Sequence, residues 1–199
     1  NRGDKFEYLT SVNSGQFGLT EYAAEKFGKN SPEARQPYKL GDMNTTVIRT
    51  YRWRTIMVQH NTTSPRPYSR INTISGTKGI LTDYPLRVAL SPKSHEWMGD
   101  AELAALKAKY VHPLWDKNGE AAKKSGGHGG MDYLLLLRLC YCLQKGLPLD
   151  IDVYDTALWS SLVELTERSS LKRGASIDMP DFTRGGWKTA EPLGIVEVS

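Results

Sequence analysis

The spacing of apolar residues changes near the middle of the chain, and this change restricts the possible folds more than any other feature. In the first half, short runs rich in β-branched residues follow one another, separated by turn residues. In the second half, apolar residues recur at helical spacing. Consecutive strands without helices between them pair antiparallel, because a parallel pair needs a long crossover connection. The sequence therefore predicts an α+β fold, a large, open, mainly antiparallel sheet with helices packed on one face.

The predicted strands lie within the first ninety residues. They cover residues 6–12, 45–50, 55–60, 69–75, 79–82 and 86–90. Gly76-Thr77-Lys78 has the composition of a hairpin turn between two of these strands. A short helix is expected over 20–27 with Thr20 as its N-cap. Residues 29–40, which contain two prolines, are expected to form a loop.

Three helices are predicted in the second half of the chain. They span 101–110, 131–145 and a segment that begins after the N-cap Asp152 and ends near Gly174. Residues 131–145 are apolar almost all round, which is typical of a buried helix. Cys140 and Cys142 lie two apart in this helix and point in nearly opposite directions, so we expect two buried free thiols.

The composition is that of an ordinary globular protein, with 39% hydrophobic and 24% charged residues among 199. A single domain over residues 1–199 is long enough to bury one full-sized core. The net charge is +4, but basic and acidic residues are mixed, so nucleic acid is not an expected partner. No apolar run approaches the ~20 residues of a membrane span. Asn1-Arg2-Gly3-Asp4 carries no signal-peptide pattern, so we expect a piece of a longer or processed protein, and periplasmic, secreted and cytoplasmic parents all stay open.

The familiar local signatures of self-contained enzymes are absent from the sequence. No Gly-x-Gly-x-x-Gly fingerprint follows a predicted strand, and there is no phosphate-binding loop, His-Glu-x-x-His or Gly-x-Ser-x-Gly motif. The four histidines share no metal-ligand spacing, so no metal site is expected. Catalytic residues are therefore not assigned within this chain.

The segment Ser125-Gly126-Gly127-His128-Gly129-Gly130-Met131-Asp132 precedes the apolar helix and is the best pointer to a binding site. Glycine lets a ligand approach the backbone closely, and a helix start offers free N–H groups to polar atoms. Attachment to a buried helix would fix His128, and Asp132 could orient a neighbour through a hydrogen bond. The alternative is a flexible loop with a solvated histidine.

Two further segments combine polar side chains with turn residues. In Ser64-Pro65-Arg66-Pro67-Tyr68-Ser69-Arg70, the prolines stiffen a connection between strands and fix where Arg66, Tyr68 and Arg70 project. Arginine suits carboxylate or phosphate, and tyrosine offers an apolar face and a hydroxyl; an ordinary surface loop is the alternative. Gly41-Asp42-Met43-Asn44-Thr45-Thr46 leads into a strand, and simple turn chemistry of its Asp and Asn is the favoured interpretation.

Taken together, these three segments resemble one known family. With Leu147-Pro148-Leu149-Asp150-Ile151-Asp152-Val153-Tyr154-Asp155 and Pro180-Asp181-Phe182-Thr183-Arg184-Gly185, they are similar to the C-terminal half of the NAD-dependent glycoside hydrolases of family 109. That family is the α-N-acetylgalactosaminidase group within the Gfo/Idh/MocA oxidoreductase superfamily. The resemblance covers nearly the whole chain, and its motifs are long and ordered.

The resemblance implies a parent enzyme with two domains. An N-terminal Rossmann domain, absent from this chain, would hold NAD, and residues 1–199 would form the C-terminal domain whose sheet walls the substrate pocket. The expected mechanism is redox-assisted elimination: hydride passes from sugar C3 to NAD⁺, the C2 proton becomes acidic, the glycosidic bond breaks, water adds and the hydride returns. The isolated chain is expected to be inactive, because the dinucleotide fingerprint and the family's upstream tyrosine and histidine have no match here.

The resemblance also suggests which residues face the substrate. Tyr68 matches a tyrosine expected to contact the sugar. His128 is expected to be the hydrogen-bond partner of a sugar hydroxyl or of a neighbouring side chain. Arg66 and Asp132 are supporting candidates, and no cofactor-binding residue is assigned within the chain.

Two other functions fit the same residues. The chain could be the C-terminal domain of a sugar or polyol NAD(P)-dependent dehydrogenase of the same superfamily, in which hydride stays on the cofactor. It could also be an oligomerisation module, because an open antiparallel sheet with an exposed face can pack against a second copy. Oligomerisation and substrate binding are compatible roles for one sheet.

Overall fold

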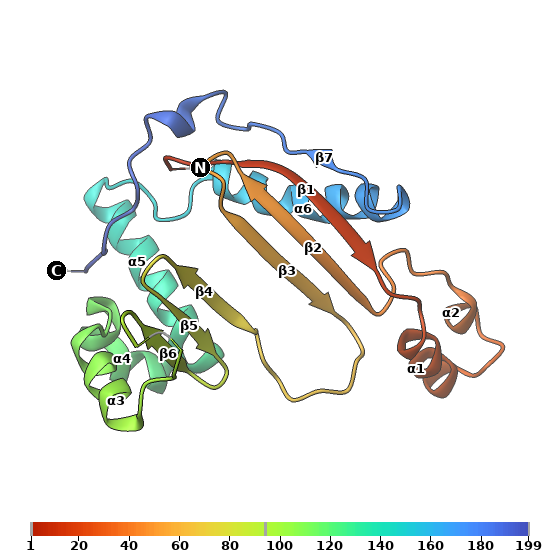
Figure 1. The fold of residues 1–199 in the computed structure, drawn as a ribbon, viewed down its shortest axis with the longest axis horizontal. Helices are drawn as coiled ribbons and strands as arrows, with labels where there is room; N and C mark the ends of the chain where they lie inside the picture. Colours follow the sequence, from red (N-terminus) through yellow and green to blue (C-terminus); the bar gives the residue numbers. More distant parts are fainter. Residues whose placement is uncertain (1, 94, 199) are drawn as a thin grey trace. The chain divides into compact units, whose positions relative to one another are not determined.

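The structure, a computed structural model, describes residues 2–93 and 95–198 and has an α+β fold (Figure 1). Its paired strands run antiparallel, which confirms the predicted fold class. Unit 1 comprises Asn1–Pro65 and Leu149–Gly194, and unit 2 comprises Arg66–Pro148 and Ile195–Ser199. The strands form a four-stranded sheet in unit 1 and a three-stranded sheet in unit 2. That residues 1–199 act as one domain stays a prediction.

Unit 1 is a sheet of strand order β3-β2-β1-β7 with one long helix against it. Its elements are β1 (Phe6–Asn13), α1 (Gly18–Phe27), α2 (Pro32–Arg35), β2 (Met43–Thr50), β3 (Thr55–Asn61), α6 (Val153–Leu171), β7 (Ile177–Asp178) and the 3-10 helix η2 (Gly186–Lys188). Figure 1 shows α6 lying beside β1, with which it makes contact. The predicted pairing of the segments 45–50 and 55–60 is confirmed by β2 and β3.

The core of unit 1 lies between the sheet and α6. Leu9 of β1 is directly opposite Ile48 of β2, and both side chains are fully buried. They pack with Leu158 and Leu165 of α6, because alternate strand residues point to the same face. Asp152 caps α6 as predicted, accepting hydrogen bonds from the backbone N–H groups at the helix start.

A buried polar network joins the sheet to the C-terminal part of α6. The backbone N–H of Ser11 donates to Ser169 Oγ at 2.8 Å, and the Asn44 amide donates to Ser170 Oγ at 3.2 Å. The Ser11 hydroxyl also pairs with that of Thr46 at 2.8 Å. These buried groups are therefore satisfied by one another, which fixes the register of helix on sheet.

Helix α1 begins earlier than predicted, and the predicted N-cap Thr20 is wrong. The helix starts at Gly18, and its N-cap Phe17 provides no side-chain cap. The cap comes from Asp42, whose carboxylate accepts the backbone N–H groups of Phe17, Gly18 and Leu19 at 2.7, 2.8 and 2.9 Å. A carboxylate there also suits the positive end of the helix dipole. The expectation of simple turn chemistry for the segment 41–46 is therefore not met, because Asp42 caps a helix from a distant part of the chain and Asn44 bonds to Ser11 and Ser170.

Two α-helices, one of four residues and one of thirteen, were not predicted. Within the expected loop 29–40, α2 begins at Pro32, and the Ser31 hydroxyl accepts the N–H of Ala34. In unit 2, a helix begins at Pro113 after His112, whose Nδ1 accepts the N–H of Leu114 at 3.2 Å. Proline at the first helical position is the sequence signal that both helices carry, because its missing N–H would be unpaired there anyway.

Unit 2 has a sheet of strand order β4-β5-β6 and three α-helices. Its elements are β4 (Asn72–Gly76), β5 (Gly79–Asp83), β6 (Arg87–Leu90), α3 (Asp100–Lys109), α4 (Pro113–Ser125), the 3-10 helix η1 (His128–Gly130) and α5 (Met131–Lys145). The predicted hairpin is confirmed, with Gly76 opposite Gly79. Strand β4 begins later than predicted because Ile71 has φ 48°, which an extended strand does not allow.

Helix α5 has the predicted bounds, but its predicted burial is wrong. Cys142 is its only buried residue, and Cys140 is exposed. Within unit 2 the helix packs on α4 and η1, which cover one side of it. Its other side, which we call the leucine face, is exposed and consists of Leu135, Leu136, Leu139 and Leu143. Among the described residues, no helix is long and apolar enough to cross a bilayer.

We expect Asp42→Asn to lower the thermal stability of the chain, and the deficit to depend on pH. The hydrogen bond from the Leu19 N–H, with those from its neighbours, lowers the pKa of Asp42. An acid whose pKa is lowered by folding stabilises the protein above its unfolded pKa, about 3.9 for Asp, and this is lost as pH falls through the folded value. Thermal unfolding from neutral to strongly acidic pH should show the deficit fading in acid. Asp178→Asn, at an exposed position on β7, is the control, and a deficit that persisted in acid would contradict the prediction.

We expect Gly130→Ala to destabilise unit 2 more than Gly129→Ala. Both positions have positive φ, at 101° and 70°, where a Cβ costs about 1–2 kcal/mol. At Gly130 the Cβ would also lie 2.7 Å from the backbone carbon of Ala122, whereas at Gly129 it meets nothing within 4 Å. Denaturant unfolding measures both losses, and equal losses would show that α4 does not hold the turn at Gly130.

Candidate functional site

The glycine-rich turn between α4 and α5 depends on an unusual backbone. All five residues from Gly126 to Gly130 have positive φ, including His128 at 45°. Glycine adopts these values readily. Among the remaining residues, only Asn, Asp and His do so with some frequency. The close approach of Gly130 to Ala122 joins the turn to α4. The turn is therefore packed against α4 at Gly130, while the His128 side chain itself is mostly exposed to solvent.

Within this turn His128 is paired with Asp132. The Nδ1 atom lies 2.9 Å from Asp132 Oδ2 and 3.1 Å from Oδ1. An ionised carboxylate only accepts hydrogen bonds, so Nδ1 carries the proton and donates it, which leaves Nε2 as an acceptor in the neutral ring. A Cβ at Gly127 would lie 2.7 Å from Asp132 Oδ2, so glycine makes room for the carboxylate. The His128 side chain is 71% exposed, so its free nitrogen is open to a ligand.

A second group of side chains forms around Tyr68. Arg70 Nε donates to the Tyr68 hydroxyl at 3.0 Å, and this hydrogen bond raises the pKa of the guanidinium. The Tyr84 ring lies edge-on to the Tyr68 ring, with 6.0 Å between centroids and 68° between planes. Tyr68 is nevertheless 74% exposed. Its orientation is therefore held by two neighbours, while most of its surface remains available.

The structure brings some of the predicted residues together. His128 and Asp132 form a pair, and Tyr68 joins Arg70, which lies in the same predicted segment. Arg66 is exposed and forms no side-chain hydrogen bond or ion pair within residues 2–93 and 95–198. Sequence reasoning missed Tyr84, whose contact with Tyr68 comes from a different segment with no shared local pattern. The roles of Tyr68, Arg66, His128 and Asp132 as substrate contacts stay predictions.

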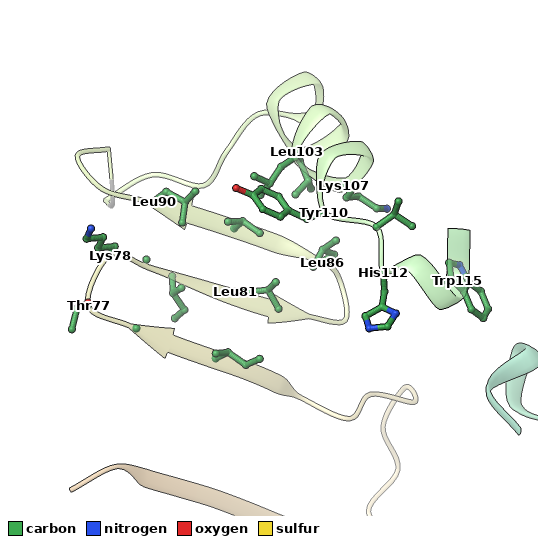
Figure 2. A pocket seen from close by; sticks show the side chains of 17 residues that line it. Thr77, Lys78, Leu81, Leu86, Leu90, Leu103, Lys107, Tyr110, His112 and Trp115 are labelled. Carbon is green, nitrogen blue, oxygen red and sulfur yellow. The ribbon is translucent and has the colours of Figure 1, made fainter. Parts of the chain in front are cut away.

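A hollow in unit 2 is separate from these residues. It measures about 920 Å³ and lies between one face of the three-stranded sheet and the α3–α4 region (Figure 2). Its wall is mostly aliphatic and aromatic, and none of the four predicted residues lines it. Its charged or titratable side chains are Lys78, Lys107, Tyr110 and His112. The paired polar residues therefore mark the candidate site better than this mostly apolar hollow does.

The described residues do not form a site for a dinucleotide or a metal. A dinucleotide-binding loop connects a strand to a helix and holds the pyrophosphate at the helix start. Here the glycine turn connects α4 to α5, and the His128 imidazole is hydrogen-bonded to Asp132. Within residues 2–93 and 95–198, no group of three or more His, Cys, Asp or Glu side chains could hold a metal ion.

Comparison with known proteins connects this chain to longer ones. The model of the glycosyl hydrolase 109 C-terminal domain matches residues 1–189. A glycosyl hydrolase family 109 protein from Shewanella amazonensis is 50% identical over 201 residues, covering 99% of this chain and 44% of that protein. Glycosyl hydrolase family 109 protein 2 from Shewanella sp. (strain ANA-3) is 50% identical over 200 residues, covering 98% and 43%. The chain therefore spans less than half the length of these relatives.

Two solved structures share the fold. A levoglucosan dehydrogenase in complex with NADH and levoglucosan matches with a TM-score of 0.58 and 16% identity, covering 89% of this chain and 46% of that one. An oxidoreductase domain protein from Kribbella flavida matches with a TM-score of 0.55 and 14% identity, covering 90% and 47%. Likeness at this identity concerns the fold alone, and it agrees with the predicted oxidoreductase-type architecture.

The predicted resemblance is thus confirmed at the level of the family. The family model covers nearly all of the sequence, and curated relatives share half of its residues. This chain belongs to the glycosyl hydrolase 109 C-terminal domain family.

Proposed function

We propose that this chain is the substrate-side domain of an NAD-dependent glycosidase that acts on α-N-acetylgalactosaminides by redox-assisted elimination and hydration. Membership of the glycosyl hydrolase 109 family supports the reaction class. The observation that carries the proposal is the His128–Asp132 pair, which presents one imidazole nitrogen to solvent from a turn joined to two helices. A ligand site needs such a fixed and accessible polar group.

His128 is proposed to bind a sugar hydroxyl through Nε2. The carboxylate of Asp132 accepts the Nδ1 proton and so fixes which nitrogen is free. A hydroxyl can donate to that nitrogen, and no change in the charge of the imidazole is required. Asp132 therefore acts by orienting His128, and the pair discriminates between sugars that do and do not present a hydroxyl there.

Tyr68 is the second proposed contact. An exposed tyrosine offers the apolar face of its ring to the carbon face of a sugar and its hydroxyl to a polar atom. Arg66 precedes Tyr68 by two residues on the same proline-bounded segment. It is a supporting candidate to bind a polar or anionic group of the substrate. Both side chains belong to unit 2, as do His128 and Asp132.

NAD is proposed to be held by an N-terminal Rossmann domain of the parent protein. The curated relatives are more than twice as long as this chain, which leaves room for such a domain. When bound there, NAD would supply the reversible oxidation of the sugar. The residues of this chain would bind and orient the sugar, and no cofactor contact is assigned to them.

We expect the full-length parent, supplied with NAD⁺, to release the chromophore from a chromogenic α-N-acetylgalactosaminide, and the isolated 199-residue chain to release none. The reason is that the chain has no strand–glycine loop–helix unit for the dinucleotide among its described residues. Turnover by the isolated chain would contradict the proposal that NAD is held by a separate N-terminal domain. The circular dichroism spectrum of the isolated chain should be that of a folded protein. The absence of turnover is then not due to unfolding.

We expect His128→Asn in the parent to lower kcat/KM about 5- to 150-fold, the range for one lost hydrogen bond to a buried polar group. Asparagine tolerates the positive φ at this position, so the substitution removes Nε2 with little effect on the backbone. Asp132→Asn should give a smaller loss, because the imidazole remains but loses its orienting carboxylate. His95→Ala, at an exposed loop position, is the matched control. Equal values for His128→Asn and the control would remove His128 from the site.

A sugar or polyol dehydrogenase is the second candidate function. It is favoured by the fold likeness to a levoglucosan dehydrogenase in complex with NADH and levoglucosan. In that case the parent would accumulate NADH in proportion to the sugar oxidised, without releasing a leaving group. A glycosidase would use NAD⁺ catalytically, so the same reaction followed by NADH absorbance and by chromophore release separates the two.

Association through the sheet is compatible with either activity. Val12, Val47 and Met57 are exposed on β1, β2 and β3. Val47 is directly opposite Met57, so these two lie on one face of the sheet, the face opposite the Leu9–Ile48 pair. Such a face can be covered by a second copy of the chain. Light scattering measures the molar mass of the parent and so reports whether it forms a dimer or a larger oligomer.

A further inference from the structure

We propose that Arg70 and Tyr84 are positioning residues that hold Tyr68 as a hydrogen-bond donor toward an acceptor oxygen of the sugar. This inference rests on the proposed function and goes beyond it, since neither residue belongs to the predicted substrate contacts. The geometry behind it is one hydrogen bond and one ring contact, both made to Tyr68 from within unit 2.

The hydrogen bond from Arg70 determines whether the Tyr68 hydroxyl acts as a donor or as an acceptor toward a ligand. Arginine has donors and no acceptor, so the 3.0 Å contact between Arg70 Nε and the phenolic oxygen places the proton of that bond on Arg70. The phenolic oxygen therefore accepts from Arg70, and its own hydrogen points elsewhere. The hydrogen that Tyr68 still has to donate then suits an acceptor oxygen of a ligand on the exposed side.

The neighbouring backbone keeps Arg70 within reach of Tyr68. Pro65 and Pro67 limit the backbone before Tyr68, and the Ser69 hydroxyl accepts the N–H of Ile71 at 3.0 Å. Arg70 and Tyr68 are two residues apart on this short stretch. The hydrogen bond is thus a local one and does not need a distant element to form.

Tyr84 supports the ring from a different segment. It follows β5 and meets the Tyr68 ring edge-on, an arrangement that aromatic pairs favour. A solvent-exposed tyrosine ordinarily moves among rotamers, and fixing it in advance lowers the entropy that a ligand must offset. Two independent contacts on a side chain that is 74% exposed are what such preparation for a ligand requires.

The test is a double-mutant cycle in the full-length parent. Tyr68→Phe removes the hydroxyl and should raise KM more than it lowers kcat, because a binding contact acts on both ground and transition states. Arg70→Met should raise KM about threefold or more in the wild-type background and leave it unchanged in the Tyr68→Phe background. Equal effects of Arg70→Met in the two backgrounds would show that Arg70 meets the ligand itself, and would overturn the proposal.

Tyr84 offers a matched pair of variants. Tyr84→Phe keeps the ring and should leave KM unchanged, whereas Tyr84→Leu removes the ring edge and should reproduce part of the Arg70→Met effect. That part should also vanish in the Tyr68→Phe background. A loss in Tyr84→Phe equal to that in Tyr84→Leu would show that the Tyr84 hydroxyl, not its ring, matters, and would remove Tyr84 from the proposed role.

A spectroscopic measurement separates this inference from the proposed function. With 3-fluorotyrosine placed at position 68 of the parent, Arg70→Met should shift the fluorine resonance, and Arg70→Lys should restore part of the shift by returning a donor. If the resonance moves but the parent has no glycosidase activity, the proposed function is wrong, whereas the positioning of Tyr68 by Arg70 is supported. If the parent is active and the resonance does not move, the positioning role is wrong.

Discussion

Unit 1 depends on one pair of side chains, Leu9 opposite Ile48, both buried beneath α6. A shift of β1 by one residue would turn Leu9 to the other face of the sheet and replace it by a polar or aromatic neighbour. The same register brings Ser11 and Asn44 beneath the C-terminal part of α6, where they bond to Ser169 and Ser170. Apolar packing and polar pairing thus require the same alignment, which is why a single register is specified.

Unit 2 follows a different logic, since its candidate site depends on a few local constraints of the backbone. The glycine turn allows a carboxylate to sit beside an imidazole, and the proline-bounded segment keeps an arginine beside a tyrosine. In both groups a side chain that is mostly exposed is hydrogen-bonded to a charged neighbour. We propose that the exposed member of each group meets the ligand, and that its orientation is set before the ligand arrives.

Much of the architecture could be predicted because its signals are local. The bounds of α5 follow from an apolar run between Gly130 and Gly146, and the cap of α6 follows from Asp152. Non-local contacts could not be predicted in this way. The cap of α1 comes from Asp42, which lies more than twenty residues beyond the helix start, and no pattern near Phe17 announces it.

The same distinction applies to the site and to burial. His128 and Asp132 are four residues apart, so their segment could be singled out from the sequence, whereas the contact of Tyr84 with Tyr68 needs the folded chain. The apolar composition of α5 predicts that both of its sides are covered, yet one side carries the exposed leucine face. Composition reports that a surface is suited to burial and does not name what covers it.

The positive φ of His128 has a consequence for how variation at this position is interpreted. Histidine, asparagine and aspartate are the side chains that tolerate this backbone best, and β-branched residues tolerate it worst. Selection on the shape of the turn would therefore exclude most replacements even if the imidazole had no role. An invariant histidine in homologues would not by itself be evidence of substrate contact, whereas a change from histidine to asparagine that abolished activity would separate chemistry from conformation.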